Sequence, residues 1–181
     1  MDYFSEKLPS IALVVVETGE EPSLHSHVLP VHCHIEFLKD SGCCKRSRAF
    51  NLGFEVFEPS KDFFIFLDSD ICLTREDIKA NLLKCREYDF ASSFSEIFDL
   101  NEEDTLKILD DNMRWDYNGM YHSRKKADIC NASCIFTRRG MRLIGGWEES
   151  DDQEAGLTSK KVRPLLRVYD SPNPARRLFH G

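Results

Sequence analysis

Residues 63–70, Phe-Phe-Ile-Phe-Leu-Asp-Ser-Asp, constrain the fold of this chain more than any other stretch. The five apolar residues predict a short strand that is buried on both faces. Two carboxylates follow directly, at Asp68 and Asp70, and alternate side chains of an extended chain point the same way. We therefore expect both carboxylates to converge at the carboxyl end of a sheet strand, where ligands lie in open α/β sheets.

Two interpretations of the Asp68-Ser69-Asp70 sequence are open at this point. Like charges that are held close together repel unless a positive group lies beside them, and Mg²⁺ is typically held by one or two carboxylates plus substrate phosphates. Asp and Ser also satisfy local backbone groups in ordinary turns. The first interpretation predicts a divalent metal site, and the second predicts only a connection after the strand.

The order of the predicted elements is typical of an α/β protein. Apolar runs predict strands over residues 11–16 and 34–38, in addition to residues 63–67. Helices are predicted from residue 48 and after a capping box at Thr74. The order β, β, α, β, α favours a layered sheet with helices packed on it. Later in the chain we expect a helix capped by Asn101, a strand over residues 129–136, a short helix between Thr137 and Gly145, and a strand over residues 165–169.

Helical spacing also predicts which side chains face the core. On the helix after Thr74, the spacing places Ile78, Leu82 and Cys85 on one face. On the helix after Asn101, the expected inward residues are Leu106, Leu109 and Met113.

Length and cysteine usage bound the class of protein. We expect one catalytic domain over residues 1–181, which is compatible with a piece of a longer polypeptide. No apolar run approaches the roughly 20 residues that span a bilayer, so no membrane span is expected. Seven cysteines, with Cys43 and Cys44 adjacent and no C-x-x-C pair, argue against a disulfide framework and favour a reducing, cytoplasmic location.

The charge distribution argues against nucleic acid as a partner. The net charge is −7, and Lys and Arg are dispersed apart from short clusters such as residues 45–48, whereas nucleic-acid binding needs a concentrated basic face. An acidic protein that handles phosphates needs a metal ion or a few placed basic groups. The Asp68 and Asp70 pair and the Arg48 region supply candidates for both.

Histidines crowd the stretch that precedes residue 35. Together with the nearby cysteines they are conceivable zinc ligands. Their spacing matches no zinc pattern, so histidines in loops and at a strand edge are the favoured interpretation. The residues concerned are His25, His27, His32, Cys33, His34, Cys43 and Cys44.

Residues 145–154 form a second informative stretch. Gly145 and Gly146 predict a tight turn, and Trp147 follows them beside five acids within seven residues. An exposed Trp face suits contact with a sugar ring, and a carboxylate near it could take a proton from a sugar hydroxyl. The alternative is a solvated acidic loop or a helix N-terminus. A third candidate is His180, because neutral imidazole is a reasonable further ligand for a Mn²⁺-type ion held by carboxylates.

These stretches together resemble the metal-dependent glycosyltransferases of the GT-A fold, namely the inverting family 2 and the β-1,4-galactosyltransferase-like group. The Asp-x-Asp motif of the family is matched by Asp68-Ser69-Asp70, and its Arg-Ala-x-Asn-x-Gly pattern is matched by residues 48–53. Its Gly-Gly-aromatic segment and acidic motif are matched by residues 145–147 and 151–154, with Asp151 in the place of the family's Glu. Its late metal-binding histidine is matched by His180.

The resemblance implies a nucleotide-diphospho-sugar transferase fold, which is a Rossmann-like mixed sheet flanked by helices. It implies inverting transfer of a sugar from a nucleotide-diphosphate donor, with UDP favoured, to a hydroxyl of a glycan or other acceptor. The implied metal ligands for Mn²⁺ or Mg²⁺ are Asp68, Asp70 and His180, and the implied general base is Asp152. Trp147 would pack on the acceptor or donor sugar, and Glu149 or Asp151 would orient the acceptor. The implied nucleotide contacts are Glu17, Asp40, Arg48, Asp68 and Ser69.

Two other classes of function remain open. A nucleotidyltransferase with a similar sheet also uses paired aspartates and a metal, and it releases pyrophosphate from a nucleoside triphosphate. A non-catalytic sugar-binding domain would bind a glycan without metal or nucleotide.

Overall fold

The computed structural model of this chain describes residues 12–24, 33–39, 46–110, 123–126, 133–149 and 162–179. These residues form four α-helices and ten β-strands, which confirms the predicted mixed α/β class. The chain divides into two compact units: unit one comprises residues 1–61 and 147–156, and unit two comprises residues 62–146 and 157–181. The assignment of residues 1–181 to a single catalytic domain stays a prediction.

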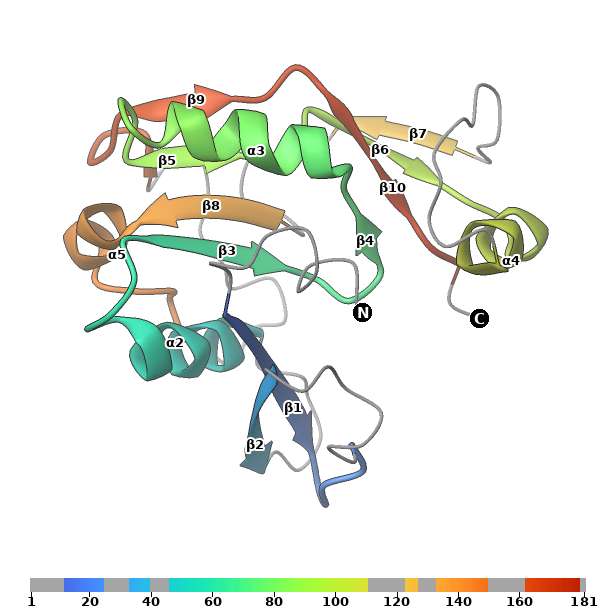
Figure 1. Cartoon of the computed structure of the whole chain (residues 1–181), viewed down its shortest axis with the longest axis horizontal. Helices are drawn as coiled ribbons and strands as arrows, with labels where there is room; N and C mark the ends of the chain where they lie inside the picture. The colour runs from blue at the N-terminus through green and yellow to red at the C-terminus, as the bar shows by residue number, and fades with distance from the viewer. Residues whose placement is uncertain are drawn as a thin grey trace. The chain divides into compact units, whose positions relative to one another are not determined.

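Unit one contains a parallel strand pair and a helix. Strand β1 (Leu13–Gly19) pairs with β2 (Cys33–Lys39), so both strands predicted in this region are confirmed with slightly shifted bounds. Helix α2 (Arg46–Phe57) packs on β1 (Figure 1). A Cβ atom at Gly53 would meet the Val16 side chain at 3.5 Å, an ordinary van der Waals distance, so the helix packs on the strand at this position without depending on glycine.

The first sheet of unit two has the order β3-β8-β5-β9. Strand β3 (Phe63–Leu67) has the predicted bounds and runs antiparallel to β8 (Ser133–Thr137). Strand β8 is also antiparallel to β5 (Phe90–Ser92), which is parallel to β9 (Val168–Asp170). Strands β3, β5 and β9 therefore point the same way, and their carboxyl ends lie at one edge of the sheet (Figure 1).

Helix α3 (Arg75–Lys84) covers one face of this sheet. One residue from each strand lies in a single row across the sheet, and this row packs with Leu82 and Cys85 from the end of the helix. The predicted inward positions of Ile78, Leu82 and Cys85 are confirmed. The members of the row are Ile65, Ile135, Ala91 and Tyr169.

Aromatic rings line the alternate positions of the same strands. Phe66 and Phe90 both pack edge-on against Phe136, with ring centroids 6.0 and 4.7 Å away. Burial of β3 is confirmed for one face only: Phe64 and Phe66 are buried, whereas the alternate residues Ile65 and Leu67 are half-buried. The prediction is wrong at the first residue, because Phe63 is 41% exposed where the strand begins.

The predicted helix ends are confirmed by side-chain hydrogen bonds. The Thr74 side chain caps α3 by accepting from the Asp77 amide at 3.0 Å, and Thr137 caps α5 (Arg138–Ile144) in the same way. Helix α5 ends at Gly145, whose φ of 71° is left-handed and therefore suits glycine.

Helix α4 (Glu102–Asp110) begins as predicted, because Asn101 Oδ1 accepts from the Asp104 amide at 2.8 Å. The inward position expected for Leu106 is wrong: Leu106 is 54% exposed, whereas Ile108 is completely buried. The reason is that the helix starts at the Asn101 cap, and with this start the helical rotation places Asp104, Thr105 and Ile108 on the inward face. The Leu109 side chain and Met113 lie outside the described residues.

The second sheet of unit two has the order β4-β10-β6-β7. Its central strand β10 (Pro174–Arg177) is antiparallel to β4 (Ile71–Cys72) and parallel to β6 (Glu96–Asp99). Strand β7 (Ser123–Lys126) is antiparallel to β6. None of these four strands was predicted from the sequence, because they are short and lack an apolar alternation.

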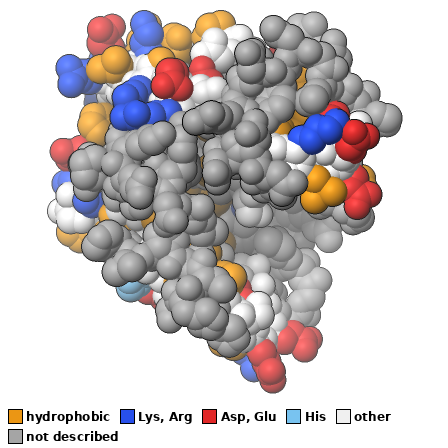
Figure 2. Space-filling model, turned by 45° about the vertical axis from the view of Figure 1, so that its right-hand side comes forward, with side chains coloured by type: hydrophobic (Ala, Val, Ile, Leu, Met, Phe, Trp, Pro, Cys, Tyr) orange, Lys and Arg blue, Asp and Glu red, His pale blue; other side chains and the backbone are white. Residues whose placement is uncertain are grey.

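Charged side chains of both signs lie side by side on the described surface (Figure 2). Arg163 pairs with Asp170 at 2.7 Å, and Arg138 pairs with Asp62 at 3.0 Å. Exposed pairs of this kind contribute little to stability because water screens them. No helix among the described residues combines the length and the apolar character needed to cross a membrane.

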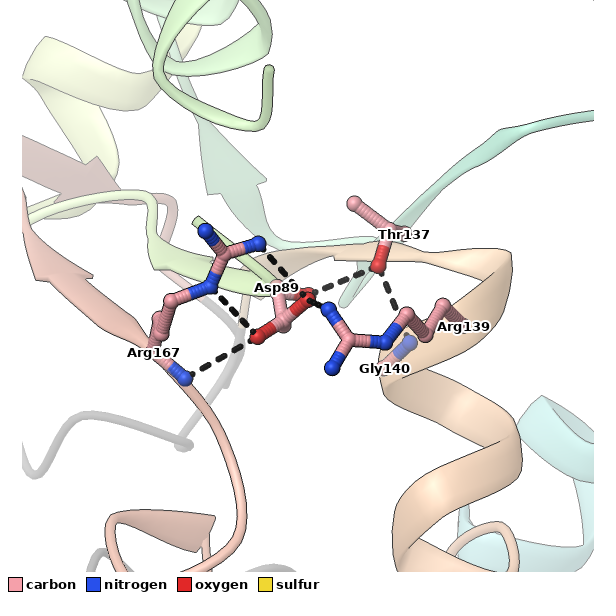
Figure 3. Close-up of polar contacts among 5 residues, drawn as sticks. All are labelled: Asp89, Thr137, Arg139, Gly140 and Arg167. Atoms are coloured by element: carbon pink, nitrogen blue, oxygen red, sulfur yellow. Dashed lines mark hydrogen bonds and ion pairs between the residues drawn. The ribbon is translucent and has the colours of Figure 1, made fainter. Parts of the chain in front are cut away.

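A buried carboxylate, Asp89, joins three chain segments at the amino edge of the first sheet. Its carboxylate accepts from Arg139 Nη1 at 3.1 Å and from the backbone N and Nε of Arg167, each at 3.1 Å. Figure 3 shows the two guanidinium groups approaching from different segments, one in α5 and one just before β9. The Asp89 carbonyl also accepts from the Thr137 amide at 3.0 Å, so β5, β8 and β9 are fixed together at this point.

Asp89 remains charged in spite of its burial. Desolvation is the largest single effect and raises its pKa, but the hydrogen bonds from Arg167 and the charges of Arg167 and Arg139 together outweigh it. The net result is a pKa below the usual aspartate value of 3.8. Asp89 is therefore an ionised structural anchor at neutral pH.

Candidate functional site

The Asp68-Ser69-Asp70 sequence forms a tight turn at the carboxyl edge of the first sheet. Strand β3 ends at Leu67, and the Ile71 amide closes the turn by donating to the Asp68 carbonyl at 3.1 Å. Asp68 and Asp70 are half-buried, and Ser69 is exposed. The predicted position after a buried strand is confirmed, but the extended geometry is wrong because the chain turns directly into β4.

The last described strand brings a distant part of the chain to this turn. Strand β10 pairs with β4 so that Arg177 lies opposite Ile71, and the Leu178 amide donates to the Asp70 carbonyl at 2.8 Å. The Phe179 amide donates to Thr105 Oγ1 at 2.9 Å. His180 is the next residue in the sequence and lies outside the described residues.

An ion pair lies on the same end of β10. Arg177 Nη2 contacts Asp99 Oδ1 at 2.6 Å, and these two residues are register partners in β10 and β6. The Leu100 amide donates to the Arg177 carbonyl at 3.0 Å. The ends of β4, β6 and β10 are therefore tied together beside Asp70.

The residues at this turn suit a hard cation better than a soft one. Asp68 and Asp70 offer carboxylate oxygens, which Mg²⁺ and Mn²⁺ prefer. Burial, followed by the charge of Asp70, raises the pKa of the Cys72 thiol to about 11, so this thiol is protonated at neutral pH. Within the described ranges no three His, Cys, Asp or Glu side chains form a metal-binding group, and the predicted third ligand, His180, lies outside them.

In unit one, Asn51 of α2 holds the segment that begins at Trp147. Asn51 Nδ2 donates to the Trp147 carbonyl at 3.0 Å and to Glu149 Oε1 at 2.8 Å. Asn51 Oδ1 accepts from the Trp147 amide at 2.8 Å. The two motifs that carry the resemblance in this unit, residues 48–53 and the stretch after Gly146, are thus in direct contact.

Trp147 is not the exposed platform that its acidic neighbours suggested. It is only 3% exposed, and its ring packs on Phe50 with centroids 4.9 Å apart. The physical reason is that α2 supplies both an aromatic partner and the Asn51 hydrogen bonds, which neighbouring residues in the sequence do not reveal. Glu148 and Glu149 are exposed, so these two acids do face solvent.

Two of the predicted nucleotide contacts, Glu17 and Arg48, are among the described residues of unit one. The Glu17 carboxylate, near the end of β1, accepts from the Ser23 amide at 2.7 Å and from the Leu24 amide at 3.2 Å. Glu17 therefore folds the following loop back onto the strand. Arg48 lies in the first turn of α2 and is exposed.

The remaining predicted site residues are Asp40, Asp151, Asp152 and His180, which lie outside the described residues. Of the conceivable zinc ligands, Cys33 and His34 are described, and His34 Nε2 contacts Glu36 Oε1 at 2.6 Å at the exposed side of β2. The other candidates, His25, His27, His32, Cys43 and Cys44, also lie outside the described residues.

Sequence reasoning missed four of the polar residues that organise these regions. Asn51 was noted only as part of a motif, although its place one turn after Arg48 on α2 was a usable signal. Asp89 and the partners Arg177 and Asp99 gave no signal, because their contacts join segments far apart in the sequence.

Comparison with known proteins leaves the geometry as the basis for assigning a function. No protein-family model matches this chain, and no curated protein sequence matches it.

Proposed function

We propose that this chain is a metal-dependent inverting glycosyltransferase of the GT-A type. It would move a sugar from a nucleotide-diphosphate donor, with UDP favoured, to a hydroxyl of a glycan or other acceptor. The observation that carries the proposal is the hydrogen bond from the Leu178 amide to the Asp70 carbonyl. It brings the chain that leads to His180 beside the Asp-x-Asp turn, as the proposed ligand set requires.

The sheet supports the same assignment. The Asp68-Ser69-Asp70 turn follows β3 at the edge where β3, β5 and β9 end, and ligands of α/β sheets lie at the carboxyl ends of strands. The mixed strand directions are compatible with the GT-A sheet, which is Rossmann-like and mixed.

Asp68 and Asp70, together with His180, would hold the divalent ion, and their oxygen and nitrogen donors suit Mn²⁺ or Mg²⁺. When bound, such an ion supplies positive charge that stabilises the departing nucleotide diphosphate. Asp68, Ser69, Glu17, Asp40 and Arg48 are the proposed nucleotide contacts.

Asp152 is the proposed general base. Its carboxylate takes the proton of the acceptor hydroxyl while that oxygen bonds to the anomeric carbon of the donor. The bond from this carbon to the diphosphate oxygen breaks, and the electron pair leaves with the nucleotide diphosphate. Attack from the face opposite the leaving group inverts the anomeric configuration. Glu149 and Asp151 are the proposed residues that orient the acceptor.

The test is calorimetric titration of UDP and of GDP, with and without Mn²⁺, into the wild-type protein and an Asp70→Ala variant. We expect metal-dependent binding of one nucleotide by the wild type and a loss of about 100-fold in affinity for Asp70→Ala. Asp62→Ala is the matched control, since Asp62 is an exposed aspartate that precedes β3 in the same unit. Metal-dependent binding that survives Asp70→Ala would contradict the assigned role of this turn.

Two other results would assign the chain to other classes. Consumption of a nucleoside triphosphate with release of pyrophosphate would identify a nucleotidyltransferase. Binding of a glycan with no metal and no nucleotide requirement would identify a sugar-binding domain.

A further inference from the structure

Asn51 connects helix α2 to a segment nearly a hundred positions later in the chain. Its side chain makes two hydrogen bonds to the peptide groups of Trp147, which is 96 residues away, and one to Glu149, which is 98 residues away. One planar amide thus holds both a backbone N–H and a backbone C=O of the same residue. This arrangement fixes the position and the direction of the chain at Trp147.

The third hydrogen bond of Asn51 orients the carboxylate of Glu149. Glu149 is exposed, and Asn51 Nδ2 donates to its Oε1 at 2.8 Å. A carboxylate has about four lone-pair positions, so one hydrogen bond sets its direction and leaves capacity for further donors. Hydroxyl groups of a sugar are donors of the required kind.

Trp147 has a different task from the one that its sequence context suggested. With 3% of its surface exposed and its ring packed on Phe50, the indole offers no open face to a sugar. It anchors the segment against α2 instead. Acceptor recognition therefore falls to the polar groups that follow Trp147, and among these Glu149 is the one that Asn51 contacts.

We infer that Asn51 is a positioning residue for acceptor binding, which acts by holding Glu149 where its carboxylate accepts hydrogen bonds from acceptor hydroxyls. This inference rests on the proposed function and extends it to the acceptor side of the site.

The variant Asn51→Asp keeps one of the three hydrogen bonds of this side chain and removes the other two. The aspartate keeps an oxygen that can accept from the Trp147 amide, but it has no N–H to donate to the Trp147 carbonyl or to Glu149. It also sets a second negative charge beside Glu149. The control is Thr137→Ala, which removes side-chain hydrogen bonds to Gly140 and Asp89 in unit two, within a region that carries no described site residue.

The first measurement is the fluorescence of Trp147 in a Trp115→Phe background, in which it is the single tryptophan of the chain. Asn51→Asp is expected to shift the emission of the buried indole to longer wavelength, whereas Thr137→Ala leaves it unchanged. An unshifted emission maximum in Asn51→Asp would overturn the holding role.

The second measurement is UDP release from UDP-galactose, UDP-glucose and UDP-N-acetylglucosamine, with water or p-nitrophenyl glycosides as acceptors. We expect Asn51→Asp to raise the acceptor KM by about 10-fold or more, while UDP affinity and hydrolysis by water stay within about two-fold. An unchanged acceptor KM would reject the positioning role and leave the proposed function standing. Failure of the wild-type protein to bind UDP or GDP with Mn²⁺ would instead reject the proposed function, and the acceptor role with it.

Discussion

Two sets of aspartates lie at opposite edges of one sheet in unit two. Asp89 precedes β5 at the amino edge, where it is buried between two guanidinium groups. Asp68 and Asp70 follow β3, which runs parallel to β5, and they are half-buried on a tight turn. The comparison teaches that the same residue type can join strands through its buried carboxylate at one edge of a sheet and form a half-buried turn at the other.

The largest effect is expected from Asp152, a carboxylate with a proposed catalytic role and no proposed structural role, which therefore contrasts most sharply with Asp89. Asp152→Asn is expected to lower the turnover number for glycosyl transfer by about a thousand-fold, because the amide cannot take the acceptor proton. UDP affinity, measured by calorimetry with Mn²⁺, should stay at the wild-type value. Retention of most of the transferase activity would show that another residue is the base.

Gly140→Ala should disrupt the contact between helix α5 and the backbone of Asp89 at the amino edge of the first sheet. A Cβ atom at this position would lie 2.5 Å from the Asp89 carbonyl oxygen, which is backbone and cannot rotate away. We expect the free energy of unfolding to fall by about 3 kcal/mol, as measured in urea. Gly53→Ala is the matched control, since its Cβ meets the Val16 side chain at an ordinary 3.5 Å. Equal stability of the two variants would contradict the tight contact at Gly140.

Asp89→Asn tests the charge at the same edge. It replaces an ionised acceptor of several hydrogen bonds with a neutral amide, so the free energy of unfolding should fall by about 2 kcal/mol at pH 7. Nucleotide affinity should be unaffected in the folded variant, in contrast to Asp70→Ala. If Asp89→Asn lost metal-dependent nucleotide binding but kept its stability, Asp89 would be a binding residue and the structural role assigned to it would be wrong.

The free energy of unfolding should also depend on pH in a defined direction, because Asp89 must be ionised to bind its arginine partners. Because the pKa of Asp89 is lowered on folding, its charge stabilises the native state above the unfolded value of about 3.8, and this contribution is lost as the pH falls through the lower, folded pKa. The stability difference between the wild type and Asp89→Asn should therefore narrow below about pH 4. Urea unfolding at several pH values measures it.

Local signals in the sequence predicted the local features of the fold. The apolar run of β3 gave its bounds, and the caps at Thr74, Asn101 and Thr137 formed as expected because each depends on residues three positions away. The fold class followed from the order of these elements.

Features that depend on distant partners were missed or mistaken. Strand β10 is Pro-Ala-Arg-Arg, which has no strand-like pattern of its own and forms because β4 and β6 pair with it. The exposure of Trp147 was mispredicted for the same reason, since Phe50 and Asn51 come from a helix far away in the chain. The turn at Asp68 was placed correctly, but its closure depends on the immediate start of β4.

The position of β10 has a consequence for how the protein is made. Among the described strands, β4 and β6 are joined through β10, which is synthesised about a hundred residues after β4. A ribosome that has released β3 to β6 has therefore produced two strands whose shared neighbour is still missing. Contacts of such long sequence separation form late and slowly. The second sheet, and the hydrogen bond at Asp70 with it, is completed only after residues 174–178 have been synthesised.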